Sequence, residues 1–243
     1  MKKIVIEVLY PEYCNLYGDR GNLSCLLYKL RQAGVETEVI ETGLFDVPAF
    51  VDRPVDFLYM GPCTERQQEE IIRRLHPYRD ALAARMQSEA VTLATGNALE
   101  MFGEYILRPD ESRVEGLNLM PMHAKRFNRL RHNELCVGEF EGMKITGFKN
   151  QLSHTYGNNP NPFLQMQTGT GINPEVKQEG WHTGGFFATY LIGPLLPLNP
   201  PFTAYLLRRL VPEYQAAPMP FEMEAYHRRL EELKDPAVNH GGH

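Results

Sequence analysis

The sequence lacks any apolar run close to the roughly 20 residues that a membrane-spanning helix requires. Residues 1–10 lead straight into a strand-like pattern without a signal-peptide cleavage site, so we expect a cytoplasmic protein. The sequence also lacks an excess of positive charge, since its formal net charge is -5. Without a positive field to attract phosphates, nucleic acid is not an expected partner. A small molecule or another protein fits this composition better.

Paired cysteine motifs are also missing. The four cysteines are scattered and form no CxxC or CxxH pair; they are Cys14, Cys25, Cys63 and Cys136. This spacing argues against a zinc site and against a disulfide framework, so we expect reduced thiols. The sequence gives no reason to expect a metal or a cofactor.

The chain is long enough to bury a full core. Its 243 residues are 43% hydrophobic and 23% charged, which favours one large domain over two small ones. We place that domain at residues 1–212. The remainder, residues 213–243, is predicted to be a C-terminal helical tail with an amphipathic helix near 221–233.

Strand patterns alternate with helix patterns over the first hundred residues. The predicted strands lie at 4–10, 35–40, 56–60 and 90–94, and the predicted helices at 21–33, 65–86 and 98–106. Thr64 is a suitable N-cap for the second helix, and Pro77 marks a bend in it. This alternation predicts an α/β fold with a mostly parallel sheet flanked by helices. Ligands are then expected at the carboxyl ends of the strands, near the loops after Tyr10, Met60 and Ala94.

The second half of the chain has a different character. Residues 135–140 and 143–148 flank Glu141-Gly142 and predict an antiparallel hairpin added to the main sheet. Residues 151–180 are rich in Asn, Gly, Pro and Thr, which indicates a long ordered loop. A late strand at 186–191 and a helix at 201–210 complete the predicted domain.

Three stretches together resemble one family. They are YPEYCNLYGDRGN at 10–22, GNALEMFG at 96–103 and TYLIGPLLPLNP at 189–200. In this order and spacing they resemble the CobB/CobQ-like glutamine amidotransferases. Within that family, the residues of the first and last stretches are most similar to the motifs of the glutaminase subunit of lipid II isoglutaminyl synthases. The resemblance covers about Tyr10 to Pro200. It implies the flavodoxin-like α/β fold of class I amidotransferases, and a role in amidating a cell-wall precursor or a corrinoid.

The resemblance also implies a catalytic cysteine and histidine, and this chain has neither. In the family a cysteine thiolate on a strand-to-helix turn attacks the side-chain amide of glutamine, a histidine assists the proton transfers, and backbone N–H groups hold the oxyanion. The cysteine position of the CGGYQLLG turn falls on Gly96, and the histidine position falls on Ile192. Neither residue has an atom that can do this chemistry. Glycine also adopts the strained turn conformation at little cost, so Gly96 should relax the turn.

The resemblance places the old ligand pocket around a defined set of residues. We expect it to include Asp19, Asn22, Gly61, Cys63, Thr95, Asn97, Glu100, Arg129 and Gln151. Arg129 falls where the family carries an arginine associated with glutamine recognition, although the glycine that follows it in the family is His132 here. Asp19 and Asn22 are in the best-matched motif, where they either hold the loop or bind a ligand. The loops that carry Asn22, Cys63 and Gly96 should converge on one cleft, with Gly96 facing Ile192.

Other residues offer alternative chemistry. Cys63 follows the third strand and is the alternative nucleophile of a rearranged site, although no histidine is placed to ionise it and a small loop residue of ordinary reactivity is the favoured interpretation. Thr95 has no apparent base, and His154 is either a relocated base or a solvated loop histidine. The basic cluster at Lys125, Arg126, Arg129 and Arg131 is interpreted as a solvated loop face.

The sequence therefore favours a non-catalytic homologue. We expect it to work by binding, either to a Mur-ligase-type synthetase subunit or to a small molecule in the former glutamine pocket. The alternative is an active amidotransferase or glutaminase that supplies ammonia through a rearranged site such as Cys63.

Overall fold

The computed structural model describes residues 3–128, 131–214, 220–235 and 238. At its centre is a six-stranded sheet with the order β13-β14-β4-β3-β1-β2. The strands from β14 to β2 are parallel, whereas the edge strand β13 is antiparallel to β14. The bounds of these strands are Ile4–Leu9 (β1), Thr37–Thr42 (β2), Phe57–Met60 (β3), Val91–Thr95 (β4), Trp181–Thr183 (β13) and Phe186–Thr189 (β14). The predicted mostly parallel sheet is confirmed.

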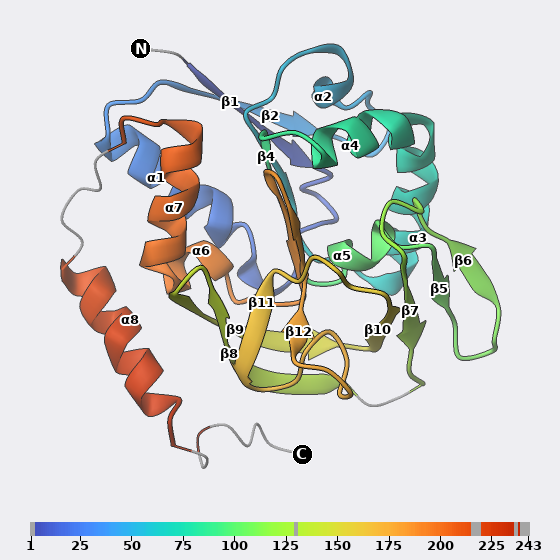
Figure 1. The fold of residues 1–243 in the computed structure, drawn as a ribbon. Helices are drawn as coiled ribbons and strands as arrows, with labels where there is room; N and C mark the ends of the chain where they lie inside the picture. Colours follow the sequence, from blue (N-terminus) through green and yellow to red (C-terminus); the bar gives the residue numbers. More distant parts are fainter. Residues whose placement is uncertain (1–2, 129–130, 215–219, 236–237, 239–243) are drawn as a thin grey trace.

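Helices cover both faces of this sheet (Figure 1). One face packs against α1 (Gly21–Gln32), α6 (Leu195–Leu198) and α7 (Pro200–Leu210), through a core that includes Ile6, Leu26 and Phe202. The other face packs against α3 (Glu65–Leu75), α4 (Arg79–Met86) and α5 (Ala98–Met101). Every residue of β3 and β4 is buried, and successive side chains on a strand point to opposite faces of the sheet. Both faces of these strands are therefore covered, which explains their largely apolar sequences.

The second predicted helix begins and bends where the sequence indicates. The Thr64 hydroxyl accepts from the Gln67 backbone N–H, and the Gln67 side chain accepts from the Thr64 N–H, which forms a capping box. The helix is interrupted at Pro77, which lies in the 3-10 turn His76–Tyr78 between α3 and α4. Short turns at Leu16–Gly18 (η1) and Ala49–Asp52 (α2) complete the helical elements of this half.

Two further four-stranded sheets accompany the central sheet; in Figure 1 the one with β8, β9, β11 and β12 is drawn below it and the one with β5, β6 and β7 is drawn to its right. One has the order β10-β7-β5-β6 and the other β12-β11-β8-β9. The predicted hairpin is confirmed as β8–β9, and it is longer than expected. The strands are Tyr105–Leu107 (β5), Arg113–Glu115 (β6), Met122–Arg126 (β7), His132–Phe140 (β8), Met143–Gln151 (β9), Ser153–Gly157 (β10), Leu164–Thr168 (β11) and Gln178–Glu179 (β12).

Two predicted elements are wrong in extent. The helix expected at 98–106 ends at Met101, and Tyr105–Leu107 is a strand. A Cβ at Gly103 would lie 2.6 Å from the Met122 carbonyl oxygen, so the chain passes too close to β7 for a helix to continue. The segment at 151–180 is not one long loop, since it contains β10, β11 and β12. Buried Leu164 and Met166 alternate with exposed Gln165, a strand pattern that the surrounding polar residues obscure in the sequence.

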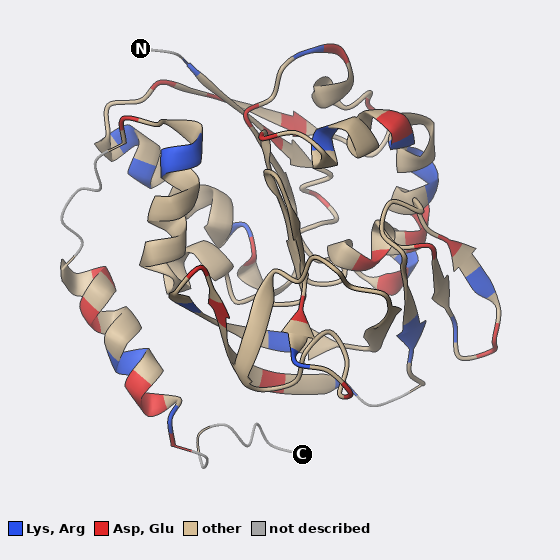
Figure 2. Cartoon of the chain, viewed as in Figure 1, with Lys and Arg blue, Asp and Glu red and all other residues tan. Residues whose placement is uncertain are grey.

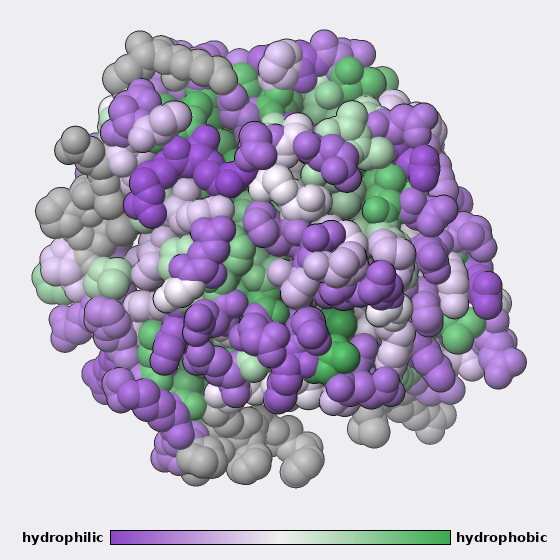
Figure 3. Space-filling view, in the orientation of Figure 1, coloured by the Kyte–Doolittle hydropathy of each residue, from purple (hydrophilic) through white to green (hydrophobic). Residues whose placement is uncertain are grey.

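The tail contributes helix α8 (Pro220–Glu232), which lies beside α7. Most charges lie on helices and loops, and the middle of the central sheet carries almost none (Figure 2). The face seen in Figure 3 is mainly hydrophilic, with small separate apolar patches. Within the described ranges, no helix combines the length and apolar character needed to cross a membrane.

Candidate functional site

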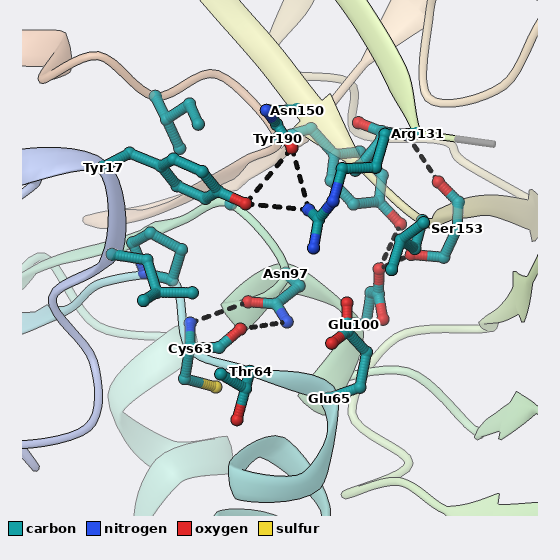
Figure 4. A pocket seen from close by; sticks show the side chains of 16 residues that line it. Tyr17, Cys63, Thr64, Glu65, Asn97, Glu100, Arg131, Asn150, Ser153 and Tyr190 are labelled. Carbon is teal, nitrogen blue, oxygen red and sulfur yellow. Dashed lines mark hydrogen bonds between the residues drawn. The ribbon is translucent and has the colours of Figure 1, made fainter. Parts of the chain in front are cut away.

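A small pocket lies where the loops after β1, β3 and β4 meet the ends of β9 and β10 (Figure 4). Its cavity volume is ≈ 40 Å³, enough for on the order of two or three water molecules. The loop after β1 contributes Tyr17, the loop after β3 contributes Cys63, and the turn after β4 contributes Gly96. The loops therefore converge as the parallel sheet requires, because the carboxyl ends of its strands share one edge.

Gly96 forms the strand-to-helix turn between β4 and α5. Its φ is 61°, in the left-handed region that residues other than glycine rarely adopt. A Cβ built on Gly96 would lie 2.6 Å from Cβ of Pro62, too close for the present packing. The turn thus keeps the backbone conformation that presents a side chain in the family. Glycine adopts this conformation without strain, but it has no side chain and so no reactive group.

Ile192 lies directly against this turn. Its Cγ2 would be 3.3 Å from a Cβ at Gly96, so the expected proximity of these two positions is confirmed. The backbone of Ile192 is fixed by two hydrogen bonds with Phe148 on β9, at 2.9 and 3.1 Å. The Ile192 side chain is fully buried, so it fills the space beside Gly96 with apolar atoms.

Asn97 ties the turn to the loop after β3. The Cys63 backbone N–H donates to Asn97 Oδ1 at 3.0 Å, and Asn97 Nδ2 donates to the Cys63 carbonyl oxygen at 2.8 Å. The Cys63 side chain is 3% exposed. A hydrogen bond with Cys14 and burial both raise the pKa of the Cys63 thiol far above its usual range. A thiolate is the reactive form, and this environment suppresses it.

A buried polar network supports the pocket from below. The Asp19 carboxylate accepts hydrogen bonds from the hydroxyls of Tyr59 and Thr95. Burial raises the pKa of Asp19, while the hydrogen bonds from Thr95 and Tyr59 oppose that shift. Asn22 Nδ2 donates to the Tyr59 hydroxyl at 3.2 Å, and Asn22 Oδ1 accepts from the Leu196 N–H at 2.7 Å. Asp19, Asn22 and Thr95 therefore hold three loops together and do not line the pocket.

Gly61 belongs to the same support. A Cβ at this position would lie 2.5 Å from the Cys14 carbonyl oxygen, so only glycine allows the loops after β1 and β3 to approach this closely.

A second buried network ends in the pocket at Glu100. Its carboxylate accepts from the Ser153 hydroxyl, from the Tyr190 hydroxyl at 3.0 Å and from Gln68 Nε2 at 2.9 Å. Burial raises the pKa of Glu100, whereas these hydrogen bonds and nearby Arg126 oppose the shift. Figure 4 shows the Ser153 hydroxyl directed at this carboxylate.

Three polar side chains form the opposite wall of the pocket. The guanidinium of Arg131 donates to the Tyr17 hydroxyl and to Asn150 Oδ1, both at 2.9 Å. The Tyr17 hydroxyl also donates to Asn150 Oδ1 at 3.2 Å (Figure 4). These hydrogen bonds link the loop after β1 to the β8–β9 hairpin.

The predicted pocket residues thus separate into two groups. Cys63, Asn97, Glu100 and Gln151 line the cavity, together with Gly96 and Ile192. Asp19, Asn22, Gly61 and Thr95 do not line it, and Arg129 is outside the described residues.

His154 is not on a loop, contrary to the sequence prediction. It is on β10, where it pairs with Lys125, and its ring contacts those of Phe127 and His132. Adjacent side chains on a strand point to opposite faces, so His154 points away from the side where Ser153 meets the pocket. Burial, followed by the charges of His132 and Lys149, lowers the pKa of His154 to about 4.

The interpretation of the basic cluster as a solvated loop face is wrong in part, because two of its members are on a strand and the Arg126 side chain is largely buried, whereas Lys125 is exposed. Lys125 and Arg126 are on β7. The Arg126 side chain is only 9% exposed and pairs with Glu69, at 2.7 Å from Nη1 to Oε1. Arg126 Nη2 also donates to Gln68 Oε1 at 2.7 Å and to the Glu65 carbonyl oxygen at 3.2 Å, so polar groups of α3 surround this guanidinium, and the sequence pattern does not reveal these contacts.

Sequence reasoning missed Ser153, Tyr190, Arg131, Tyr17 and Asn150 as pocket residues. Tyr17 and Tyr190 were within the quoted motifs, and Ser153 follows Gln151 by two positions. Strand periodicity would have grouped Ser153 with Gln151, but the polar composition of this segment favoured a loop.

No group of three or more His, Cys, Asp or Glu side chains is arranged to hold a metal ion within the part of the chain that the structure describes. The pocket offers instead a carboxylate, amides and hydroxyls. Such groups bind polar ligands through hydrogen bonds.

Comparison with protein families matches residues 5–200 to the CobB/CobQ-like glutamine amidotransferase domain. This range contains all three quoted motifs.

Two curated relatives and one solved structure are also similar. The relatives are both named lipid II isoglutaminyl synthase (glutamine-hydrolyzing) subunit GatD. The protein from Staphylococcus aureus (strain N315) is 26% identical and covers 86% of this chain and 85% of its own length. That from Streptococcus pneumoniae (strain ATCC BAA-255 / R6) is 28% identical, with 85% and 78% covered. A crystal structure of a glutamine amidotransferase aligns with a TM-score of 0.53 at 12% identity, over 84% of this chain and 98% of that one, which shows the shared fold.

Proposed function

We propose that this chain, which belongs to the CobB/CobQ-like glutamine amidotransferase domain family, is a non-catalytic member that acts in the cytoplasm as the partner subunit of a Mur-ligase-type synthetase. The observation that carries this proposal is the pair Gly96 and Ile192. They meet at the turn after β4, where the family resemblance calls for a nucleophile and a base, and neither has a reactive atom.

The donors expected around a developing oxyanion are also altered. Pro62 has no backbone N–H, and the Cys63 N–H already donates to Asn97 Oδ1. Stabilising an oxyanion needs free N–H donors directed at the reacting atom. This loop is poorly suited to that role, because Pro62 has no N–H and the N–H of Cys63 already has an acceptor. The loss of function thus extends beyond the two catalytic side chains.

Cys63 is a weak candidate for a replacement nucleophile. Its thiol is buried beside Cys14, and its raised pKa disfavours the thiolate. No histidine lines the pocket among the described residues. These features support a binding role over a rearranged enzyme.

The proposed partner follows from the relatives. Both are named as subunits of a lipid II isoglutaminyl synthase, and each aligns over more than two thirds of its length with this chain. We propose that this chain likewise assembles with a ligase that amidates a cell-wall precursor, but without generating ammonia itself.

A glutamine turnover assay tests the loss of catalysis. We expect purified protein to release no ammonia from glutamine above a no-enzyme blank, alone or with a Mur-ligase-type partner, because a missing nucleophile typically costs several orders of magnitude. Turnover that disappears in Cys63→Ala and persists in Thr95→Ala would instead establish the rearranged enzyme.

A binding experiment tests the partner. The full chain is mixed with Mur-ligase-type proteins of its source organism, and the mass of any complex is measured by light scattering during gel filtration. We expect a stoichiometric complex with one of them. Failure of every such protein to bind would remove the partner proposal while leaving the loss of catalysis intact.

A further inference from the structure

A second cavity lies at the edge of the central sheet opposite to the pocket at Gly96. Its volume is ≈ 610 Å³, which is within the range of roughly 300–1,000 Å³ for ligand sites. It lies at the amino ends of β3 and β4, beside the C-terminal ends of α2, α4 and α7, in the upper part of Figure 1. The carboxyl ends of the same two strands lead to the pocket at Gly96, so the two cavities are on different edges of the sheet.

Arginines outnumber acids in the wall of this second cavity. Arg53, Arg85 and Arg209 line it, together with the acids Asp56 and Glu89. Almost all of the other lining residues are apolar. Guanidinium groups bind carboxylates and phosphates through paired hydrogen bonds, and apolar walls cover the remainder of a ligand. This composition therefore fits an anionic group carried on an apolar body.

Arg85 brings a fixed positive charge to this wall. Its guanidinium donates to the carbonyl oxygens of Val55 and Val91, at 2.8 and 2.7 Å, and to Thr92 Oγ1 at 2.8 Å. Val55 and Val91 also line the cavity, so these hydrogen bonds hold the guanidinium at its wall. All three acceptors are neutral. A guanidinium has five N–H donors, and three hydrogen bonds leave two of them for another acceptor.

The charge of Arg85 is only partly compensated by the chain. Burial lowers the pKa of Arg85 to about 10, and the charges of Glu7 and Asp56 oppose this shift without cancelling it. A buried cation is stabilised by an anion that also accepts its remaining hydrogen bonds. An anionic ligand in the cavity would supply both.

Arg209 supplies an independent observation, because a carboxylate already occupies it from the cavity side. Its Nη2 pairs with Glu89, which lines the cavity, and also donates to the Gly184 carbonyl oxygen at 3.1 Å. The Glu89 side chain is 83% exposed, so solvent screens this pair and the carboxylate is readily replaced. The two guanidinium groups are thus attached two residues apart on the chain, that of Arg209 at Glu89 and that of Arg85 at Val91.

We propose that this cavity binds a small organic anion, with its carboxylate or phosphate group at the arginines of the wall and its apolar part against side chains such as Val91 and Leu210. The ligand displaces Glu89 from Arg209 and adds negative charge beside Arg85. The site shares no lining residue with the pocket at Gly96, so it stands independently of the loss of catalysis.

The proposal is tested with the full chain and three probes at equal ionic strength: benzoate, phenyl phosphate and benzyl alcohol. Isothermal titration and thermal unfolding are measured with each. We expect at least one of the two anions to bind with one-to-one stoichiometry at millimolar concentration and to raise Tm. Benzyl alcohol has a similar apolar body without the charge and should do neither. The anion that binds more tightly identifies the group that the site prefers.

Two variants of the cavity should act in opposite directions. We expect Arg209→Gln to weaken anion binding about tenfold or more, as loss of a charge-assisted hydrogen bond implies. Glu89→Gln removes the competing carboxylate and should strengthen binding about two- to fivefold, as expected for a solvent-exposed pair. Arg208→Gln is the matched control, because Arg208 is an exposed arginine on the same helix and outside the cavity. It should bind as the unaltered chain does.

The outcomes are distinct. Failure of both anions to bind, or equal binding of benzyl alcohol, would overturn the proposal. Equal weakening by Arg209→Gln and Arg208→Gln would also overturn it, since it would show only an effect of net charge. If circular dichroism shows that Arg209→Gln does not fold, Glu89→Gln decides, because unchanged or weaker binding by that variant contradicts the proposal. Glutamine is absent from these measurements, so their result leaves the test of ammonia release unaffected.

Discussion

Gly96 combines a backbone conformation with a packing constraint. Its positive φ is the conformation of a turn that displays a side chain, yet the ring of Pro62 occupies the place where a Cβ would be. A replacement residue must therefore accept a strained backbone and also displace a proline. Pro62 and Ile192 thus pack against Gly96 so closely that they leave no room for a side chain at this position.

Restoring the family residues should not restore catalysis. We expect Gly96→Cys with Ile192→His to fold, to be destabilised by about 1–3 kcal/mol from the backbone conformation alone, and to release ammonia from glutamine at the background rate. Pro62 and the Cys63–Asn97 hydrogen bonds remain, so the oxyanion donors do not return. Thermal unfolding and an ammonia assay measure both effects.

Gly96→Ala is the control for this double variant. It adds the same Cβ without chemistry, so it measures the backbone part of the stability loss, and any further loss in the double variant belongs to the sulfur of the introduced cysteine and to the buried Ile192→His change. Robust ammonia release by the double variant would show that the remaining pocket is intact, and the view that this site has been specialised for another task would have to be abandoned.

At this scale, the sequence predicts the positions that motifs mark and misses those that tertiary structure creates. The proximity of Gly96 and Ile192 followed from the motifs. The hydrogen bond from Thr95 to Asp19 joins residues 76 positions apart, and no local pattern encodes it. Whether a motif residue such as Asn22 binds a ligand or supports a loop depends on which groups surround it after folding.

The β8–β9 hairpin is the element that closes the pocket, and Glu134 fixes it to the loop before β12. The Glu134 carboxylate accepts from the Thr170 N–H and hydroxyl, each at 2.8 Å, and it pairs with His132 Nε2 at 3.1 Å. The same loop accepts two hydrogen bonds from Lys149 Nζ on β9, at 2.9 Å from Thr170 and 2.6 Å from Gly171. Both strands of the hairpin are thus held by one short segment.

Glu134 should make stability depend on pH in the acid range. Burial alone would raise its pKa, but the hydrogen bonds from His132 and Thr170 prevail and lower it to about 2. A carboxyl whose pKa is lower in the folded state stabilises the fold above its unfolded pKa, and that contribution is lost as pH falls towards the folded pKa. Because solvent screens this half-buried carboxylate, we expect Glu134→Gln to lose about 1–2 kcal/mol at pH 7, less than the full pKa shift implies, and to show a flatter decline between about pH 5 and pH 2. Urea unfolding across this pH range measures it.

Glu139→Gln provides the comparison on the same strand. Glu139 is exposed and accepts a hydrogen bond from Gln167 Nε2 at 2.8 Å, so its removal should leave the acid decline unchanged. Superimposable pH profiles for Glu134→Gln and the unaltered chain would show that Glu134 does not hold the hairpin.

Element prediction succeeded where periodicity was long and failed where strands were short. The capping box at Thr64 and the break at Pro77 are local, so the sequence contains them. β5 and β12 have three and two residues respectively, too few for an alternation to be recognised. Their pairing depends on neighbouring strands from distant parts of the chain.

At the scale of the whole molecule, the described residues form two apolar cores, one on each face of the central sheet, and the site lies at the edge between them. The fold class followed from the order of strands and helices, because a βα alternation permits few arrangements. The division between residues 1–212 and the tail was also drawn from the sequence, and it remains a prediction.

Removal of residues 213–243 tests that division. Helix α8 is attached by the Lys29–Glu222 ion pair and by the Tyr226 hydroxyl, which donates to the Lys144 carbonyl oxygen at 2.7 Å. Tyr226 is the one described residue of α8 that is buried. The truncation also removes Tyr214, which is 7% exposed and packs into the apolar core that includes residues of α7.

We expect residues 1–212 to unfold cooperatively and to retain their far-ultraviolet circular dichroism, apart from the signal of one helix. The expected loss of stability is about 3–5 kcal/mol, similar to that caused by deleting a large buried side chain.

Tyr226→Ala in the full chain separates docking of the helix from integrity of the domain. If α8 docks onto an independently folded domain, this variant should lose no more stability than the truncation, and both proteins should remain soluble. The two measurements are Tm by circular dichroism and the monomer fraction after gel filtration. A truncated protein that is insoluble or unfolds without cooperativity, beside a well-folded Tyr226→Ala protein, would show that residues 213–243 are part of the domain core. The boundary at 212 would then be wrong, because the apolar face of α7 would require the tail to complete its burial.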